Sequence, residues 1–378
     1  MNKRIYFDNA ATTSLDPEVL KAMMPYLTIH FGNPSSIYSY GRESRMAVEN
    51  SRKTVAKLLN AHPAEIFFTS GGTESTNTAL TAAVRDLGCN RILTSPIGHH
   101  ATLHTVDYLI NSGEAEVSYV RILPDGHLDL THLEQLLSES KEKCLVTLLH
   151  GNNEIGTMID LPITGEICKK YNAVFHCDTV QTLGHFPLDL RNTPVDFISG
   201  SAHKFHGPKG VGLLYVNENI KINPFIHGGS QERNMRAGTE NVYGIVGFAK
   251  ALEIATADYE KDSHYINDIK IYMMNQLKTH LKEVSFNGDP LGKSLYSVLS
   301  VNFTKTDKSE MLLFNLDINH ICASGGSACT SGADVGSHVI RAIHDDADND
   351  HITVRFSFCK YNTKEEVDYV VTKLKELI

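Results

Sequence analysis

Short apolar runs alternate with amphipathic, helix-length segments over most of the chain. The runs cover residues 65–69, 91–94, 144–149, 173–177 and 197–199. Strands that alternate with helices favour a mostly parallel sheet with helices on both faces. A further run at 211–216 follows the previous strand after a short connection, so we expect it to run antiparallel. The pattern therefore predicts an α/β fold.

The hydrophobic period becomes helical between residues 245 and 284, which predicts a long helix leaving the sheet region. Two more strands are expected beyond it, at 296–303 and 352–357, with helices between and after them. We therefore predict a large α/β domain over residues 16–256. Residues 1–15 and 257–378 are expected to form a smaller α+β domain.

Composition narrows the class of protein. A chain of 378 residues is long enough for two domains, and its net charge of -9 without basic runs gives no support for binding to nucleic acid or to a membrane surface. Apolar runs long enough to cross a membrane are missing, which favours a soluble, cytoplasmic protein. The 7 cysteines are scattered and form no zinc-binding pattern, so we expect reduced thiols and no resident metal.

A lysine and a carboxylate lie near the predicted ends of two neighbouring strands. Asp178 follows the run at 173–177, at the edge where open α/β sheets bind ligands. Gln181 projects to the same side if the next turn is helical. Lys204 lies in the run Ser-Gly-Ser-Ala-His-Lys-Phe-His-Gly-Pro-Lys-Gly at 199–210. The alternative for Asp178 and Gln181 is a helix cap and a surface amide.

An anion site is predicted where the strand at 65–69 leads into a helix. Gly71 and Gly72 allow close approach of the backbone, and Thr73 adds a hydroxyl. Free N–H groups at a helix start bind phosphate, although a Gly-Gly pair is also common in ordinary turns. Ser201 and His203, beside Lys204, are further candidate donors.

Two more polar residues follow predicted strands. The ring of His99 would stack on a flat cofactor, and the amide of Asn153 would bond a cofactor oxygen. An exposed or structural histidine and a polar turn are the alternatives. A lysine, a carboxylate for a ring nitrogen, a phosphate site and a group against the ring face are what pyridoxal 5'-phosphate (PLP) requires.

Cys329 is the candidate nucleophile. It lies in the segment Ser-Gly-Gly-Ser-Ala-Cys-Thr-Ser-Gly at 324–332, whose small residues leave the thiol free to move. A thiol beside a bound amino acid suggests capture of sulfur or of an acyl group, whereas most free cysteines are small buried hydrophobic residues. Arg355, on a predicted strand, offers a guanidinium for a substrate carboxylate, with a structural salt bridge as the alternative.

Together these motifs resemble the cysteine desulfurases of the NifS/IscS group, which are PLP enzymes of the class V aminotransferase family. The resemblance covers essentially the whole chain and implies the aspartate aminotransferase-like fold of PLP-dependent transferases. It rests on segments 6–13, 32–36, 69–75, 150–156, 203–204, 229–233, 236–241, 327–331 and 355–357.

The resemblance implies a role for each candidate. Lys204 would hold PLP as a Schiff base, Asp178 and Gln181 would bind its ring, His99 would stack on the ring and act in catalysis, and Asn153 would line the site. The phosphate would be bound by Gly72, Thr73, Ser201 and His203, with Thr239 reaching the phosphate of the neighbouring subunit of a homodimer. Arg355 and Asn33 would hold the substrate L-cysteine.

Cys329 would attack the substrate sulfur, which leaves alanine and a Cys329 persulfide. The sulfur acceptor would be an iron–sulfur scaffold protein or a pathway that thiolates tRNA or cofactors, and Cys329 would at most ligate iron–sulfur species transiently. A selenocysteine or cystine lyase of the same fold is the close alternative. An interaction protein that lost turnover is a more distant alternative, which the intact Lys204, Asp178 and Cys329 argue against.

Overall fold

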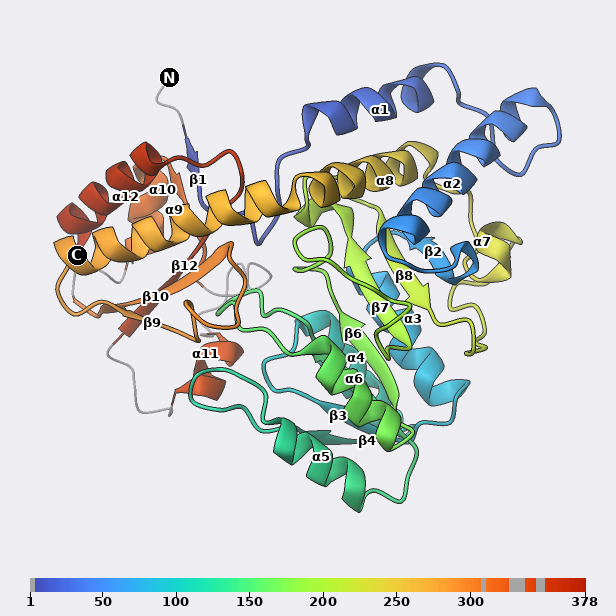
Figure 1. Cartoon of the computed structure of the whole chain (residues 1–378), viewed down its shortest axis with the longest axis horizontal. Helices are drawn as coiled ribbons and strands as arrows, with labels where there is room; N and C mark the ends of the chain where they lie inside the picture. Colours follow the sequence, from blue (N-terminus) through green and yellow to red (C-terminus); the bar gives the residue numbers. More distant parts are fainter. Residues whose placement is uncertain (1–3, 307–310, 326–336, 345–350) are drawn as a thin grey trace.

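The computed structural model describes residues 4–306, 311–325, 337–344 and 351–378. Cys329 lies outside these residues. Within them, a seven-stranded mixed sheet forms the centre of the larger part of the molecule (Figure 1). Its strands, in spatial order, are β2 (Ile66–Thr69), β8 (Gly212–Val216), β7 (Phe197–Ser201), β6 (Val174–Asp178), β5 (Cys144–Leu149), β3 (Arg91–Thr94) and β4 (Glu116–Tyr119).

The strand directions confirm the prediction of a mostly parallel sheet. β4, β3, β5, β6 and β7 are parallel to their neighbours in this series, whereas β8 is antiparallel to both β7 and β2. The prediction for the run at 211–216 is therefore confirmed. β4 was not predicted, because its short run of residues is only half-buried or exposed and lacks an apolar stretch.

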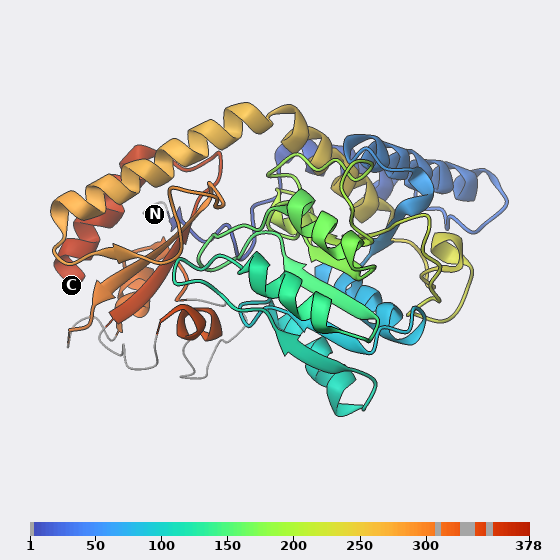
Figure 2. The same ribbon diagram turned by 60° about the horizontal axis from the view of Figure 1, so that its bottom comes forward.

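Helices cover both faces of the sheet, and successive strand residues point to alternate faces. Phe175 and Cys177 pack into one core, while Val174 packs into the core on the other side. The first core is closed by α1 (Pro17–Thr28), α2 (Ser39–Leu58), α5 (Leu130–Glu139), α6 (Leu161–Lys170) and α8 (Val242–Ala257). The second is closed by α3 (Gly72–Arg85) and α4 (His100–Asn111). Figure 2 shows these layers from another side.

The long helix expected between residues 245 and 284 is divided in two. α8 ends at Ala257, and α9 (Tyr259–His280) begins after Asp258, which caps both helices and has φ -98° and ψ 4°. The apolar period continues across the break, so the sequence pattern did not reveal it. In Figure 1 the two helices run from above the sheet to the far end of the molecule.

The smaller part of the molecule has its own sheets and core. An antiparallel sheet joins β12 (His351–Ser357), β10 (Val298–Thr304) and β9 (Ser285–Phe286). β1 (Ile5–Tyr6) pairs with β11 (Ile321–Cys322), and Asp8 forms a bridge to Ser357. The helices here are α9, α10 (Leu312–Ile318), α11 (His338–Ile343) and α12 (Lys364–Leu377).

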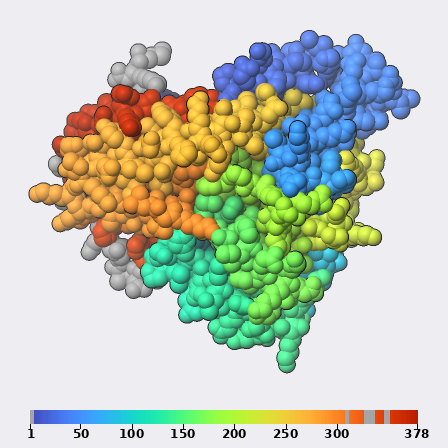
Figure 3. All heavy atoms as spheres, viewed as in Figure 1, coloured from blue at the N-terminus to red at the C-terminus, as the bar shows by residue number. Residues whose placement is uncertain are grey.

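A separate hydrophobic core supports the proposed division into a large and a small domain. It joins residues of β1, α9, β10, β12 and α12, including Phe7, Met273 and Phe356. We keep the names large domain for residues 16–256 and small domain for residues 1–15 and 257–378. In the space-filling view the first helices project from the large domain as a lobe (Figure 3). Across the described ranges, no helix combines the length and apolarity that crossing a membrane requires.

A buried ion pair holds an unusual turn on the large domain. Glu232, Arg233 and Asn234 of α7 (Gln231–Asn234) have positive φ angles of 43°, 57° and 67°, a conformation that costs free energy in residues other than glycine. The Arg52 guanidinium donates two hydrogen bonds of 2.8 Å to the Glu232 carboxylate, which also accepts one from the Phe68 N–H. These contacts fix the turn that leads towards Thr239.

Candidate functional site

A cavity of about 240 Å³ lies where β5, β6 and β7 end at their carboxyl edges. Most of the residues predicted for the site meet in this cavity. It is lined by Ala10, Ala11, Gly72, Thr73, His99, Ala101, Leu149, Asn153, Asp178, Val180, Gln181, Ser201, His203, Lys204 and Arg355.

Lys204 enters the cavity from η2 (Ala202–Lys204), the short helix after β7. Its Nζ donates hydrogen bonds to the carbonyl oxygens of Ala10 at 2.6 Å and Ala11 at 2.9 Å. These carbonyls belong to the small domain, and Gln181 also donates to Ala10 O at 2.9 Å. The lysine amine is therefore held at the boundary between the two domains.

Asp178 is the last residue of β6 and is buried. Burial raises the pKa of its carboxyl to about 6, although the hydrogen bond from Val180 N and the charge of Lys204 act in the opposite direction. Burying an ionised carboxylate costs free energy, and a positively charged partner in the cavity would offset that cost. A protonated pyridine nitrogen would be such a partner.

A helix start faces the same cavity. α3 begins at Gly72, and its N-cap Gly71 offers no side chain to the first N–H groups. A Cβ atom at Gly72 would lie 2.6 Å from Cγ2 of Val180, so only glycine fits there without a shift. Thr73, Ser201 and His203 line the cavity nearby. Free N–H groups with hydroxyl and imidazole donors suit a phosphate group.

His99 presents a neutral ring to the cavity. It is the N-cap of α4, and its Nδ1 accepts a hydrogen bond of 3.1 Å from Ala101 N, which places the ring hydrogen on Nε2. Burial, and then the charge of Lys204, lower the pKa of His99 to about 4. An uncharged flat ring is therefore available to stack on an aromatic cofactor at neutral pH.

Arg355 lies on β12 and is almost fully buried. Its Nη1 donates to Asn153 O at 2.9 Å and its Nη2 to Asp8 Oδ1 at 2.6 Å. Nε is buried without a hydrogen-bond partner among the residues that the structure describes. The guanidinium is thus oriented by the protein and keeps a donor to offer, as a site for a carboxylate requires.

The cavity fits PLP on each of these points: an amine, an enclosed carboxylate, an uncapped helix start and a neutral ring. Three predicted residues are not among those that line it. Asn33 is exposed, and its Oδ1 accepts a hydrogen bond from Ser35 N. Thr239 is exposed and lines a different pocket, with Arg236 and Glu240. Cys329 lies outside the described residues, so its position in the fold stays a prediction.

Comparisons with known proteins show the family to which the chain belongs. Residues 5–370 match the family model described as Aminotransferase class-V. The chain is 40% identical to the cysteine desulfurase IscS of Dictyoglomus turgidum over 380 residues, covering 100% of this chain and 95% of that protein. It belongs to the cysteine desulfurases of the class-V aminotransferase family.

A further relative and two solved structures are similar to the chain over nearly its whole length. The cysteine desulfurase IscS of Methanosarcina thermophila is 42% identical over 384 residues, which cover 100% of this chain and 92% of that protein. A solved NifS-like protein superposes with a TM-score of 0.91 at 38% identity, with 99% of each chain covered. A structure of SspA in complex with cysteine has a TM-score of 0.81 at 29% identity, covering 96% of this chain and 100% of that one.

Sequence reasoning missed several residues that touch the predicted site. Ala10 and Ala11 accept hydrogen bonds from Lys204 through their backbone, and no side-chain pattern predicts such a contact. Asp8 lies in a segment that carried the family resemblance, but its pairing with Arg355 depends on two segments far apart in the chain. His185, which contacts the backbone of Lys204, carries no motif at all.

The Asp178→Asn change should separate stability from cofactor binding. Burial raises the pKa of Asp178 to about 6, so ionising this carboxyl destabilises the folded state. This cost in free energy of unfolding is absent below about pH 4, grows up to about pH 6 and is complete above it. The cofactor-free variant should therefore gain about 3 kcal/mol in free energy of unfolding at pH 7 and less at pH 5. Its affinity for PLP should fall at least about tenfold, because the ring nitrogen loses its carboxylate.

Denaturant unfolding at both pH values, with and without PLP, measures these effects. Asparagine keeps an oxygen that can accept the hydrogen bond from Val180 N. A variant that is less stable than wild type at pH 7 but binds PLP equally well would contradict the role of Asp178.

Proposed function

We propose that this chain uses bound PLP to remove the sulfur atom of L-cysteine, releasing L-alanine and holding the sulfur as a persulfide on Cys329. The observation that carries the proposal is the meeting of Lys204, Asp178, His99 and Arg355 in one cavity. An amine, a buried carboxylate, a neutral ring and a carboxylate-binding guanidinium are the groups that a PLP enzyme for an amino acid needs.

We assign each part of PLP to residues of the cavity. Asp178 would pair with the ring nitrogen, His99 would lie against the ring, and Gln181 and Asn153 would reach its oxygen. The phosphate would be held by Gly72, Thr73, Ser201 and His203. When bound, PLP supplies an electron sink that makes the α-carbon and the C–S bond of an attached amino acid reactive.

The protein residues hold the substrate and move its proton. Arg355 would bind the substrate carboxylate through the donors that Asp8 and Asn153 leave available, and Asn33 is proposed as a second contact. The Lys204 amine would take and return the proton at the α-carbon, a role that requires a group within hydrogen-bond reach of that carbon. Before cofactor and substrate bind, burial and the charge of Lys204 lower the pKa of His99 to about 4, so its ring enters the reaction uncharged.

The sulfur step balances without an added oxidant or reductant. The Cys329 thiolate forms a bond to the substrate sulfur while the C–S bond of the substrate breaks. The electron pair of that bond stays with the carbon, which takes up a proton to become the methyl group of alanine. One cysteine and one thiol thus yield one alanine and one persulfide, whose outer sulfur a thiol acceptor can remove.

A homodimer forms part of the proposal. Thr239 is exposed and lies outside the cavity of its own chain, as expected if it completes the phosphate site of a second copy. The lobe formed by α1 and the loop to α2 also exposes apolar side chains, with Ile29, Phe31 and Ile37 exposed by 63%, 75% and 86%. Large exposed apolar side chains that cluster on one surface favour a protein partner.

The acceptor is proposed to be an iron–sulfur scaffold protein or another protein of thio-cofactor or tRNA thiolation pathways. A cytoplasmic location stays a prediction from the sequence. A selenocysteine or cystine lyase is the second candidate; the similarity to SspA in complex with cysteine favours cysteine as the substrate.

Mixing purified protein with PLP and then with L-cysteine tests the function. We expect a yellow protein that forms alanine and, with dithiothreitol present, sulfide in a one-to-one ratio, because each turnover releases one of each. Amino-acid analysis and a sulfide assay measure the two products. Pyruvate or transamination products would overturn the proposed reaction, and a protein that takes up no PLP would overturn the whole assignment.

A further inference from the structure

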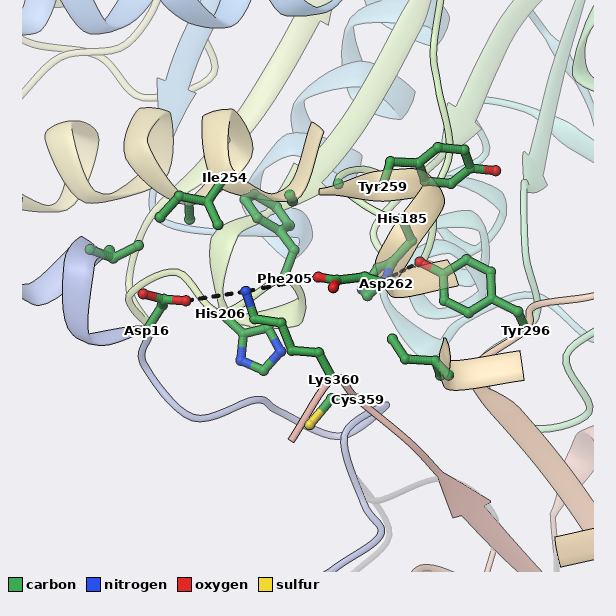
Figure 4. A pocket seen from close by; sticks show the side chains of 15 residues that line it. Asp16, His185, Phe205, His206, Ile254, Tyr259, Asp262, Tyr296, Cys359 and Lys360 are labelled. Atoms are coloured by element: carbon green, nitrogen blue, oxygen red, sulfur yellow. Dashed lines mark hydrogen bonds and ion pairs between the residues drawn. The ribbon is translucent and has the colours of Figure 1, made fainter. Parts of the chain in front are cut away.

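His185 joins the two domains directly behind Lys204. It lies in the large domain, seven residues after Asp178, and its Nε2 lies 2.9 Å from the carbonyl oxygen of Lys204. Its Nδ1 lies 3.1 Å from the hydroxyl of Tyr296, a small-domain residue between β9 and β10. Figure 4 shows the His185–Tyr296 contact. Through His185, the Tyr296 side chain of the small domain is thereby linked to the backbone of Lys204 in the large domain.

The direction of these hydrogen bonds follows from the atoms involved. A carbonyl oxygen only accepts, so the ring hydrogen of His185 lies on Nε2 and is donated to Lys204 O. Nδ1 then accepts from the Tyr296 hydroxyl. Burial lowers the pKa of His185 and raises that of Tyr296, so the ring stays neutral and the phenol stays protonated at ordinary pH. The Lys204 carbonyl therefore fixes the tautomer of His185, and the hydrogen bond from the Tyr296 hydroxyl stabilises that tautomer.

The turn that carries Lys204 is fastened on its other side as well. Thr13 N and Oγ1 donate to His203 O at 2.9 and 3.0 Å, and His206 N donates to Thr13 Oγ1 at 2.8 Å. Gly184, which precedes His185, has a φ of 77°, a conformation that favours glycine. A Cβ atom there would lie 2.7 Å from the Phe205 ring, so the backbone packs closely against that ring. The His185 loop thus packs directly against the residue that follows the lysine.

A small cavity at this junction is too small to be a second ligand site. Its volume is about 30 Å³, which is far below that of a metabolite pocket. It is bordered by both domains and by the start of α9, and Lys360 Nζ lies between the carboxylates of Asp16 at 3.3 Å and Asp262 at 3.9 Å (Figure 4). The junction is a packed joint between the domains, and charged groups of both domains line it.

We propose that His185 is a positioning residue for Lys204, and that the hydrogen bond from Tyr296 orients its ring and stabilises the tautomer that donates to the Lys204 carbonyl. The side chain of Lys204 has to move between cofactor and substrate, whereas its backbone has to stay in place. Thr13 and His185 provide two fixed points for that backbone, one from the small domain and one from the large domain. This inference rests on the proposed function, since it assumes that PLP attaches to Lys204.

Three variants of the full-length protein test the positioning role. His185→Leu removes the donor to Lys204 O and should raise the dissociation constant for PLP about tenfold, as the loss of one buried hydrogen bond implies. It should lower kcat about tenfold and leave KM for cysteine within about twofold, because Arg355 and not Lys204 is proposed to bind the substrate carboxylate. His185→Gln places an amide N–H near the Nε2 position, so the dissociation constant for PLP and kcat should both return to the wild-type values. Tyr296→Phe keeps the ring that packs on Phe186 and should have an intermediate effect.

PLP titration followed by visible absorption, steady-state kinetics and thermal unfolding measure these effects. His206→Asn is the matched control, because the ring of His206 lies near the same cavity but contacts Ser14 O at 2.9 Å instead of Lys204. If His185→Leu does not fold, the other two variants decide: wild-type values for His185→Gln, together with weaker PLP binding and a lower kcat for Tyr296→Phe, support the role.

The outcomes separate this inference from the proposed function. Wild-type protein that takes up no PLP overturns both. Wild-type protein that takes up PLP, together with a folded His185→Leu protein of unchanged affinity and kcat, overturns the positioning role alone. A Gln variant as impaired as the Leu variant also overturns it, because the donated hydrogen bond would then not be the cause.

Discussion

Replacing Lys204 with alanine should lower alanine formation from L-cysteine at least about 1000-fold, because one group both attaches PLP and moves the α-proton. The variant should also lose covalently attached PLP. Borohydride reduction, digestion and mass spectrometry would detect PLP on the peptide that contains Lys204 in the wild type and not in the variant. The lysine lies on a short helix held by contacts of its backbone, so we expect the variant to fold.

Lys209→Ala is the matched control. Lys209 follows on the same segment, is exposed and is not among the residues that line the cavity. Its removal should change the rate by less than about twofold, as is usual for exposed residues. PLP found attached to another lysine in the wild-type protein, or turnover retained by Lys204→Ala, would refute the assignment of Lys204.

Replacing Cys329 with alanine should lower sulfide release from L-cysteine at least about 100-fold, since the attacking thiolate is lost. PLP binding should not change, because none of the groups assigned to PLP is affected. Labelling the protein with an alkylating reagent after reaction with cysteine should detect an added sulfur atom on Cys329 of the wild type. The variant should carry no such sulfur.

Cys322→Ser is a suitable control, because Cys322 is a half-buried thiol of β11 and burial raises its pKa. A raised pKa leaves little reactive thiolate at neutral pH, so its removal should leave the sulfide yield unchanged. Comparing cysteine with selenocysteine decides between the two candidate functions. Desulfuration of cysteine that survives in Cys329→Ala would overturn the persulfide mechanism. If Cys329→Ala loses its activity on cysteine but keeps it on selenocysteine, the chain is a lyase that also accepts selenocysteine.

The sequence predicted the sheet well because its central strands are buried on both faces. β3 and β5 occupy the residues expected, and β6 and β7 differ from the expected ranges by one or two residues. Such strands appear as continuous apolar runs, whereas β4 at the sheet edge does not. The break at Asp258 escaped prediction because neither glycine nor proline marks it.

Within the site, the sequence predicted residues that follow strands and missed contacts made through the backbone. Asp178, Gly72, His99 and Lys204 could be placed at one edge because parallel strands end there. The carbonyls of Ala10 and Ala11 and the ring of His185 meet Lys204 only through the folding of distant segments. No local pattern encodes these contacts, so they become visible only in three dimensions.

The pairing of the first residues with the last strand has a consequence for synthesis on the ribosome. Ala10, which accepts a hydrogen bond from Lys204, is held by Ser357 of β12 through its backbone N–H at 2.8 Å. The same strand carries Arg355. The cavity residue Ala10 is therefore translated near the start of synthesis, but the strand that holds it, β12, is translated near the end. A nascent chain can build its large sheet early, but it cannot complete the cofactor site until β12 has left the ribosome.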